Sequence, residues 1–83
     1  MTDSIMLTKI QLELRGLTEQ DRKVLELIAT GRTDKEIAIR HNISLSAAKR
    51  VVGNIMKHLR AKSRTHAVYI AIMDGILDIE RTE

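Results

Sequence analysis

Apolar residues recur at helical spacing along most of the 83-residue chain. The clearest stripe consists of Ala48, Val52, Ile55 and Leu59. Its spacings of four, three and four residues place these side chains on one face of a helix that turns about 100° per residue. Ser44 precedes the stripe and is a preferred N-cap residue. The pattern predicts a helix over about 45–60 with one face on a core.

A second helix is predicted over about 19–30. Thr18 is a suitable N-cap, and the acidic residues after it favour a helix start because the helix dipole is positive there. Gly31 suits the left-handed residue that ends a helix. The expected buried positions are Val24, Leu25 and Ile28, with Leu27 at the edge.

A short helix lies between these two. Thr33 and Glu36 match a capping box, which predicts a helix from Asp34 to about His41. Asn42 tolerates the left-handed conformation of a tight turn, and we expect Ile43 to be a buried plug in that turn. Ile37 and Ala38 face the core. Two short helices joined by three or four residues predict a helix-turn-helix.

The N-terminal segment has two interpretations. Leu7, Ile10, Leu14 and Leu17 follow a helical stripe, with Asp3 or Ser4 as N-cap and Gly16 as the end. The alternation of Ile10, Leu12 and Leu14 also fits an extended arm. In a helix, the other apolar residues (Ile5, Met6, Leu12) need a partner, either the body of the domain or another subunit. Residues 1–16 are therefore a candidate contact for a dimer or a protein partner.

A last helix is predicted from Arg64 to Asp74, capped by Ser63 and ended by Gly75. Its apolar stripe is Ala67, Val68, Ala71 and Ile72. Ile76, Leu77 and Ile79 form an apolar tail, and residues 79–83 are acidic. The whole chain predicts an all-α fold, with the domain proper over 17–78.

Composition supports one small helical domain. Hydrophobic residues make up 43% of the chain and are almost all aliphatic; proline is absent and Tyr69 is the only aromatic residue. Cysteine is absent, which fits a reducing compartment. The first ten residues lack the features of a signal peptide, and the longest apolar run is too short to span a bilayer. We therefore expect a cytoplasmic protein without membrane contact.

The net charge of +3 hides one strongly basic segment. Residues 45–66 contain six basic residues and no acidic residue: Lys49, Arg50, Lys57, Arg60, Lys62 and Arg64. An ordinary exposed helix mixes both signs, so a face without acids favours a polyanionic partner over a merely solvated surface. Arg50 and Lys57 lie opposite the apolar stripe with Ser46 and Gly53, while Lys49 and Arg60 lie on one flank of the helix.

Other classes of function fit less well. His41, His58 and His66 show no metal-ligand spacing with carboxylates, and no glycine-rich phosphate loop is present, so we expect neither an enzyme nor a metal or cofactor site. A single aromatic residue disfavours binding of single-stranded nucleic acid or RNA by stacking.

Residues 17–77 resemble the LuxR/GerE-type helix-turn-helix domain of bacterial transcription regulators. The resemblance rests on LTEQDRKVLELIATGRTDKEIAIRHNIS, on Asn54-Ile55, on Leu59, and on SRTHAV at Ser63 to Val68. It implies a four-helix domain that binds double-stranded DNA and inserts its third helix in the major groove. It also implies a homodimer, often formed through the fourth helix; the corresponding residues here are Val68, Tyr69, Ile72 and Met73.

The resemblance also assigns roles to residues. The positions that reach base edges are Lys49, Arg50 and Gly53, although Gly53 has no side chain with which to read a base. The positions of phosphate contacts or caps are Thr33, Ser44, Ser46, Asn54, Lys57 and Arg64, and the basic stretch adds Arg60 and Lys62. Ala47, Val51, His58 and Arg60 depart from the residues usual in the family.

Two functions fit these residues. We expect a sequence-specific, DNA-binding transcription regulator that acts as a dimer. The family's usual input domain has no room in 83 residues, so the resemblance implies a stand-alone regulator or one with input through a partner. The alternative is a protein-binding helix-turn-helix module, an anti-activator or co-regulator with weak or no DNA binding.

Overall fold

The computed structural model describes the backbone of residues 2–78 and the side chains of residues 6–78. The helices in this part of the chain are α1 (Thr2–Arg15), α2 (Glu19–Ala29), α3 (Asp34–His41), α4 (Leu45–Leu59) and α5 (Arg64–Met73). The described residues contain no strand. The predicted all-α fold is confirmed, and of the two interpretations of the N-terminal segment the helix is correct.

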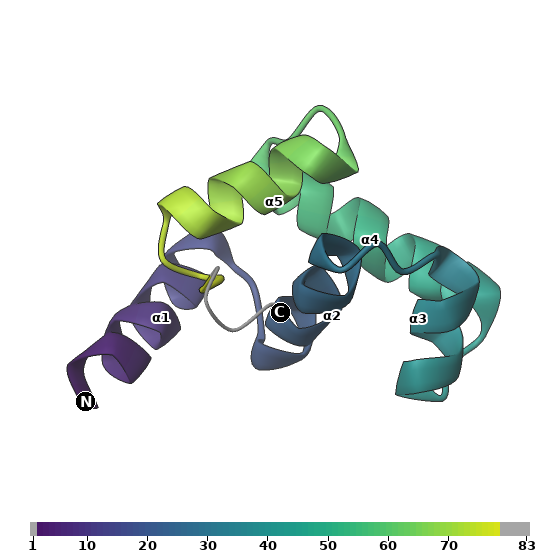
Figure 1. Ribbon diagram of the computed structural model, residues 1–83, viewed down its shortest axis with the longest axis horizontal. Coiled ribbons are helices and arrows are strands. Elements are labelled where there is room, and N and C mark those ends of the chain that lie inside the picture. The colour runs from purple at the N-terminus through teal and green to yellow at the C-terminus, as the bar shows by residue number, and fades with distance from the viewer. Residues whose placement is uncertain (1, 79–83) are drawn as a thin grey trace.

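The helices form an arch in which α1 and α3 lie at opposite ends (Figure 1). Helix α3 packs on α4, and α5 packs on both α2 and α4, while α1 contacts α2. Figure 1 shows α5 crossing the top of the molecule between the α1 end and the α4 end. The arrangement leaves one side of α4 outside the bundle.

The core follows the predicted stripes closely. Leu25, Ile37 and Ile55 are fully buried at its centre. All four residues of the α4 stripe are buried, as are Ile76 and Leu77 after α5. The sequence predicts that Ile43 is buried in the turn between α3 and α4. Its side chain is instead half-buried and packs against the edge of the core. Val68 and Ile72 are likewise half-buried, whereas Ile79 lies outside the described residues.

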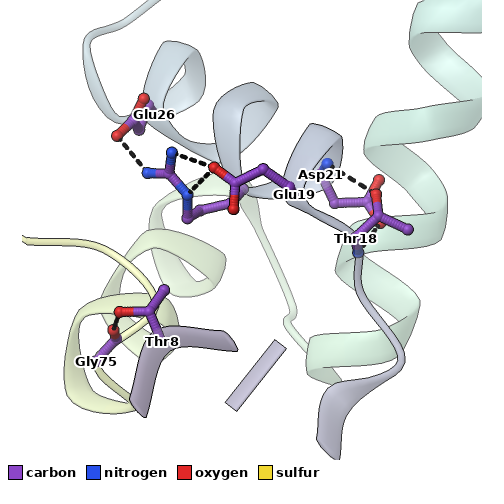
Figure 2. A network of polar contacts seen from close by, with 7 residues as sticks. Thr8, Thr18, Glu19, Asp21, Glu26 and Gly75 are labelled. Carbon is purple, nitrogen blue, oxygen red and sulfur yellow. Dashed lines mark hydrogen bonds and ion pairs between the residues drawn. The ribbon is translucent and has the colours of Figure 1, made fainter. Parts of the chain in front are cut away.

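The predicted caps begin four of the helices. The Thr18 hydroxyl accepts from the Asp21 backbone N–H at 3.1 Å, and the Asp21 carboxylate accepts from the Thr18 N–H at 2.9 Å (Figure 2). Thr33 and Glu36 form the second capping box. Ser44 and Ser63 cap α4 and α5 through their hydroxyls. These local bonds satisfy backbone donors that a helix start leaves unpaired.

Helix α1 presents a different face to the body than predicted. The Thr8 hydroxyl donates to the Gly75 carbonyl at 3.2 Å (Figure 2), and Arg15 forms an ion pair with Asp74 at 2.7 Å. Leu12 follows Thr8 by four residues and precedes Arg15 by three, so the three side chains share one face of the helix. Leu12 is only 4% exposed. The expected stripe is therefore wrong in phase, since Leu7, Ile10 and Leu14 are exposed. The helix also begins at Thr2, so neither Asp3 nor Ser4 is its N-cap.

Candidate nucleic-acid interface

The exposed face of α4 carries the residues that the sequence singled out. Burial of Ala48, Val52, Ile55 and Leu59 fixes the orientation of the helix, because these residues occupy one stripe. Ala47, Val51 and Met56 are half-buried at the edges of this stripe, and the other positions of the helix are exposed. The exposed residues of this face are Ser46, Lys49, Arg50, Gly53, Asn54 and Lys57, and Leu45 and His58 near the two helix ends are exposed as well. The structure thus brings the predicted base-reading positions and three of the predicted phosphate positions together on one helix.

The cations of this face have no acidic partner in the described part of the chain. No ion pair or hydrogen bond there involves the side chain of Lys49, Arg50 or Lys57. Several acidic side chains are engaged by other cations, as in the pair of Arg15 with Asp74 and the contacts of Arg22 with two glutamates. The positive potential of α4 is therefore uncompensated, which favours an approaching polyanion.

The carboxylates whose pKa is shifted lie in the first turns of α2 and α3. A hydrogen bond from Arg22 lowers the pKa of Glu19, and the same contact raises the pKa of Arg22. The backbone N–H of Thr33 lowers the pKa of Glu36 by donating to its carboxylate. Each shift arises from capping or from an ion pair within one helix, so none indicates a catalytic acid or base.

Two predicted phosphate-binding hydroxyls serve as caps in the structure. The Ser44 hydroxyl accepts from the Ala47 N–H at 3.0 Å. The Thr33 hydroxyl accepts from the Glu36 N–H at 3.2 Å and donates to the Glu36 carboxylate at 3.3 Å. Thr33 therefore uses both its donor and an acceptor site within the domain, whereas Ser44 keeps its hydroxyl proton for another acceptor.

Among the predicted phosphate-binding cations, Arg64 has an acidic partner in the described part of the chain. Its guanidinium donates to the Asp34 carboxylate and forms an ion pair with it. This pair joins the start of α5 to the start of α3. The sequence gives no sign of it, because the partners are 30 positions apart and neither periodicity nor capping patterns link them.

Arg60 and Lys62 lie in the turn between α4 and α5. Both side chains are exposed, and neither forms a hydrogen bond or an ion pair with another group in the described part of the chain. Arg60 has a left-handed backbone with φ of 55°. The Lys62 N–H donates to the Nδ1 atom of His66 at 3.0 Å, which ties this turn to α5.

Gly53 has open space on its side of α4. A Cβ atom added there meets no atom within 4 Å, and its φ is not positive. Nothing in the described part of the domain therefore requires a glycine at this position. The absence of a side chain allows another molecule to approach the α4 backbone closely.

The predicted dimer residues divide into two pairs on α5. Tyr69 and Met73 are 60% and 67% exposed, whereas Val68 and Ile72 are half-buried and pack against the core. Tyr69 and Met73 are thus available to a partner, whereas Val68 and Ile72 attach α5 to the core.

The described residues contain no group of three or more His, Asp or Glu side chains positioned to hold a metal ion. None of the described helices combines the length and apolar character needed to cross a membrane.

Comparison with known proteins places this sequence in a family. Residues 15–71 match the family described as bacterial regulatory proteins, luxR family. The chain is also 36% identical over 61 residues to proteins named response regulator protein VraR from Staphylococcus aureus, Staphylococcus saprophyticus and Staphylococcus epidermidis.

The aligned region covers 74% of this chain but only 29% of the length of each of these relatives. No solved structure matches the chain. The family match covers more than half of the chain and includes the whole helix-turn-helix with its basic helix. The chain therefore belongs to the luxR family of bacterial regulatory proteins, whose helix-turn-helix domain is a DNA-binding module of transcription regulation and not a catalytic one.

Proposed function

We propose that this protein is a sequence-specific regulator that inserts α4 into the major groove of double-stranded DNA. The observation that carries the proposal is the exposed face of α4, whose cations have no partner in the described chain. A major groove about 12 Å wide admits an α-helix. The opposite stripe of α4 is anchored in the core, so the helix can be presented as a rigid element.

The exposed residues have distinct roles in this proposal. Lys49 and Arg50 read base edges, because long cationic side chains can donate to the guanine O6 and N7 atoms. Gly53 lets the helix backbone come close to the groove. The phosphate contacts come from Ser44, Ser46, Asn54, Lys57, Arg60 and Lys62. Arg64 contributes after exchanging its Asp34 partner for phosphate, and Thr33 acts as a cap.

A homodimer completes the proposal. Tyr69 and Met73 offer exposed apolar surface on α5, which supports pairing of two copies through this helix. A two-fold pair would place two α4 helices on successive turns of the major groove, about 34 Å apart. Such a regulator acts in the bacterial cytoplasm, where the chromosome lies.

The test is binding of the purified protein to random duplex DNA and to the DNA upstream of its own gene over a salt series. We expect steep salt dependence, because each neutralised phosphate contributes about −0.9 to the slope of log K against log salt. We also expect tighter binding to the upstream fragment. Equal binding to both fragments would remove the sequence-specific part of the proposal.

A second function is favoured by one observation on α1. Met6, Leu7, Ile10 and Leu14 are between 47% and 73% exposed, which is unusual for neighbouring apolar residues on one short helix. This surface supports a protein-directed role, in which the chain docks on another regulator as an anti-activator or co-regulator. Absence of duplex binding even at low salt, together with loss of partner binding in an Ile10→Lys variant, would favour this function.

A further inference from the structure

The start of α5 is held by a histidine side chain as well as by its N-cap. The Ser63 hydroxyl accepts from the His66 backbone N–H at 3.1 Å. The His66 ring reaches back across the same turn, and its Nδ1 atom accepts from the Lys62 backbone N–H at 3.0 Å. These bonds satisfy backbone donors where the turn after α4 becomes a helix. The arrangement is similar to a capping box whose third helical residue is a histidine.

The other two capping boxes have a carboxylate at this position. Asp21 closes the box of α2, and Glu36 closes that of α3. A carboxylate accepts the hydrogen bond in its charged form, whereas His66 accepts it only as a neutral ring whose proton is on Nε2. Histidine changes its charge between about pH 5 and 8. The cap of α5 is therefore sensitive to protons in a pH range where the carboxylate caps are not.

Protonation would disturb the start of α5 in two ways. The charged ring carries a proton on both nitrogens, so Nδ1 can no longer accept from the Lys62 N–H. The positive charge would also lie in the first turn of α5, where the helix dipole is positive. Both effects oppose the charged form of His66 in the folded state, and neither is present in the unfolded chain.

The acidic side chains of the neighbouring helices are engaged elsewhere. On α2, Glu19 and Glu26 form ion pairs with Arg22, and the third acidic residue caps its own helix. Asp34 at the start of α3 is paired with Arg64. Helix α4 contains no acidic residue. In the described part of the chain, no carboxylate is therefore paired with His66 to stabilise its charged form.

The other charged groups near this turn are cations. Lys62 and Arg64 adjoin His66 in sequence, and the last turn of α4 contributes Lys57 and His58. Helix α1 forms its ion pair with α5 through Asp74, at the opposite end of that helix. Like charges disfavour a further positive charge, so these neighbours add to the cost of protonating His66.

We propose that His66 is a pH-sensitive cap, whose protonation releases the turn between α4 and α5 from the start of α5. The unfolded chain binds the proton more readily than the folded domain, because only the folded domain loses a hydrogen bond on protonation. The stability of the domain therefore falls as the pH falls through the range in which histidine titrates. This property of the fold is independent of DNA binding.

The first test compares the wild type with His66→Gln in urea unfolding from about pH 7.5 to about pH 5. Glutamine has an oxygen that can accept the Lys62 N–H, and it does not titrate. The unfolding equilibrium constant of the wild type should rise about fivefold relative to that of His66→Gln over this interval, as expected for loss of one hydrogen bond.

His58→Gln is the matched control. The Nδ1 atom of His58 lies 2.8 Å from the Asn54 carbonyl oxygen, which needs a donor, and the charged ring supplies one as well as the neutral ring does. His58 also lies in the last turn of α4, where a positive charge suits the dipole. His58→Gln should therefore lose stability in acid at least as steeply as the wild type.

NMR of the wild type tests the hydrogen bond directly. At neutral pH the His66 Nδ1 atom should carry no proton, and the Lys62 amide resonance should follow the titration of the His66 ring. Parallel unfolding curves for the wild type and His66→Gln would overturn the inference. A proton on Nδ1 at neutral pH, or a Lys62 amide that does not respond to the ring, would also overturn it, even if His66→Gln failed to fold.

Discussion

The exposed cations of α4 can be replaced with little effect on the fold, because Lys49, Arg50 and Lys57 form no ion pair or side-chain hydrogen bond in the described part of the chain. Arg50 is exposed and has no ion pair in the described chain. We predict that Arg50→Ala changes the free energy of unfolding by less than about 0.5 kcal/mol. It should weaken binding to the preferred DNA by about 1–3 kcal/mol and to random DNA by less.

Isothermal titration with both duplexes measures the difference for Arg50→Ala. Lys57→Ala is the matched comparison from the same helix face, and it should weaken binding to both duplexes by the same amount. An equal loss on both DNAs in Arg50→Ala would assign Arg50 to the phosphates instead of the bases.

Gly53 allows stability and binding to be separated at one position. Because an added Cβ atom meets only open space, Gly53→Ala should stabilise the domain by about 1 kcal/mol through helix propensity. Gly53→Leu should fold equally well, yet it should weaken DNA binding by about 1–3 kcal/mol through steric overlap with the groove. Thermal unfolding measures the stability of both variants, and DNA titration measures their affinity. Wild-type DNA affinity in Gly53→Leu would mean that this position does not face DNA.

At the level of single helices, the charged capping box of α3 makes the start of that helix sensitive to acid. The Thr33 N–H lowers the pKa of Glu36 in the folded state. The charged form therefore stabilises the fold above the usual glutamate pKa of 4.5, and this contribution is lost as the pH falls through the lowered folded value. Glutamine can accept the same hydrogen bond but does not titrate.

We predict that Glu36→Gln is less stable than the wild type at neutral pH and that this difference closes as the pH falls below 4.5. Urea unfolding at a series of pH values measures the difference. A gap that stays constant over the whole series would show that the Glu36 charge does not contribute to the cap.

The elements that could be predicted are those encoded by neighbours in sequence. The caps at Thr18, Thr33, Ser44 and Ser63 and the buried stripe of α4 follow from spacings of three or four residues. The face of α1 could not be predicted in this way, because polar anchors select it through Asp74 and Gly75. The ion pair of Arg64 with Asp34 could not be predicted either, because it depends on how α3 and α5 pack together.

For the whole molecule, size constrains how two copies could bind DNA. The domain measures 35 × 25 × 20 Å, so two copies in contact have centres between 20 and 35 Å apart. That range includes the roughly 34 Å between successive major grooves on one side of the duplex. A two-fold symmetric pair formed through α5 would turn both α4 helices toward the same duplex.

Dimerisation through α5 can be tested against the other exposed apolar surface. Tyr69→Glu combined with Met73→Glu should raise the dimer dissociation constant at least tenfold, because each places a charge in an apolar contact. The matched control is Leu14→Glu, which puts the same charge on α1 at a residue that is 73% exposed. Sedimentation equilibrium over a concentration series measures association, and none of the three positions is buried enough for the change to unfold the monomer. If Leu14→Glu separates the subunits and the α5 variant does not, the two-fold axis passes through α1. The spacing of the two α4 helices must then be derived from that pairing.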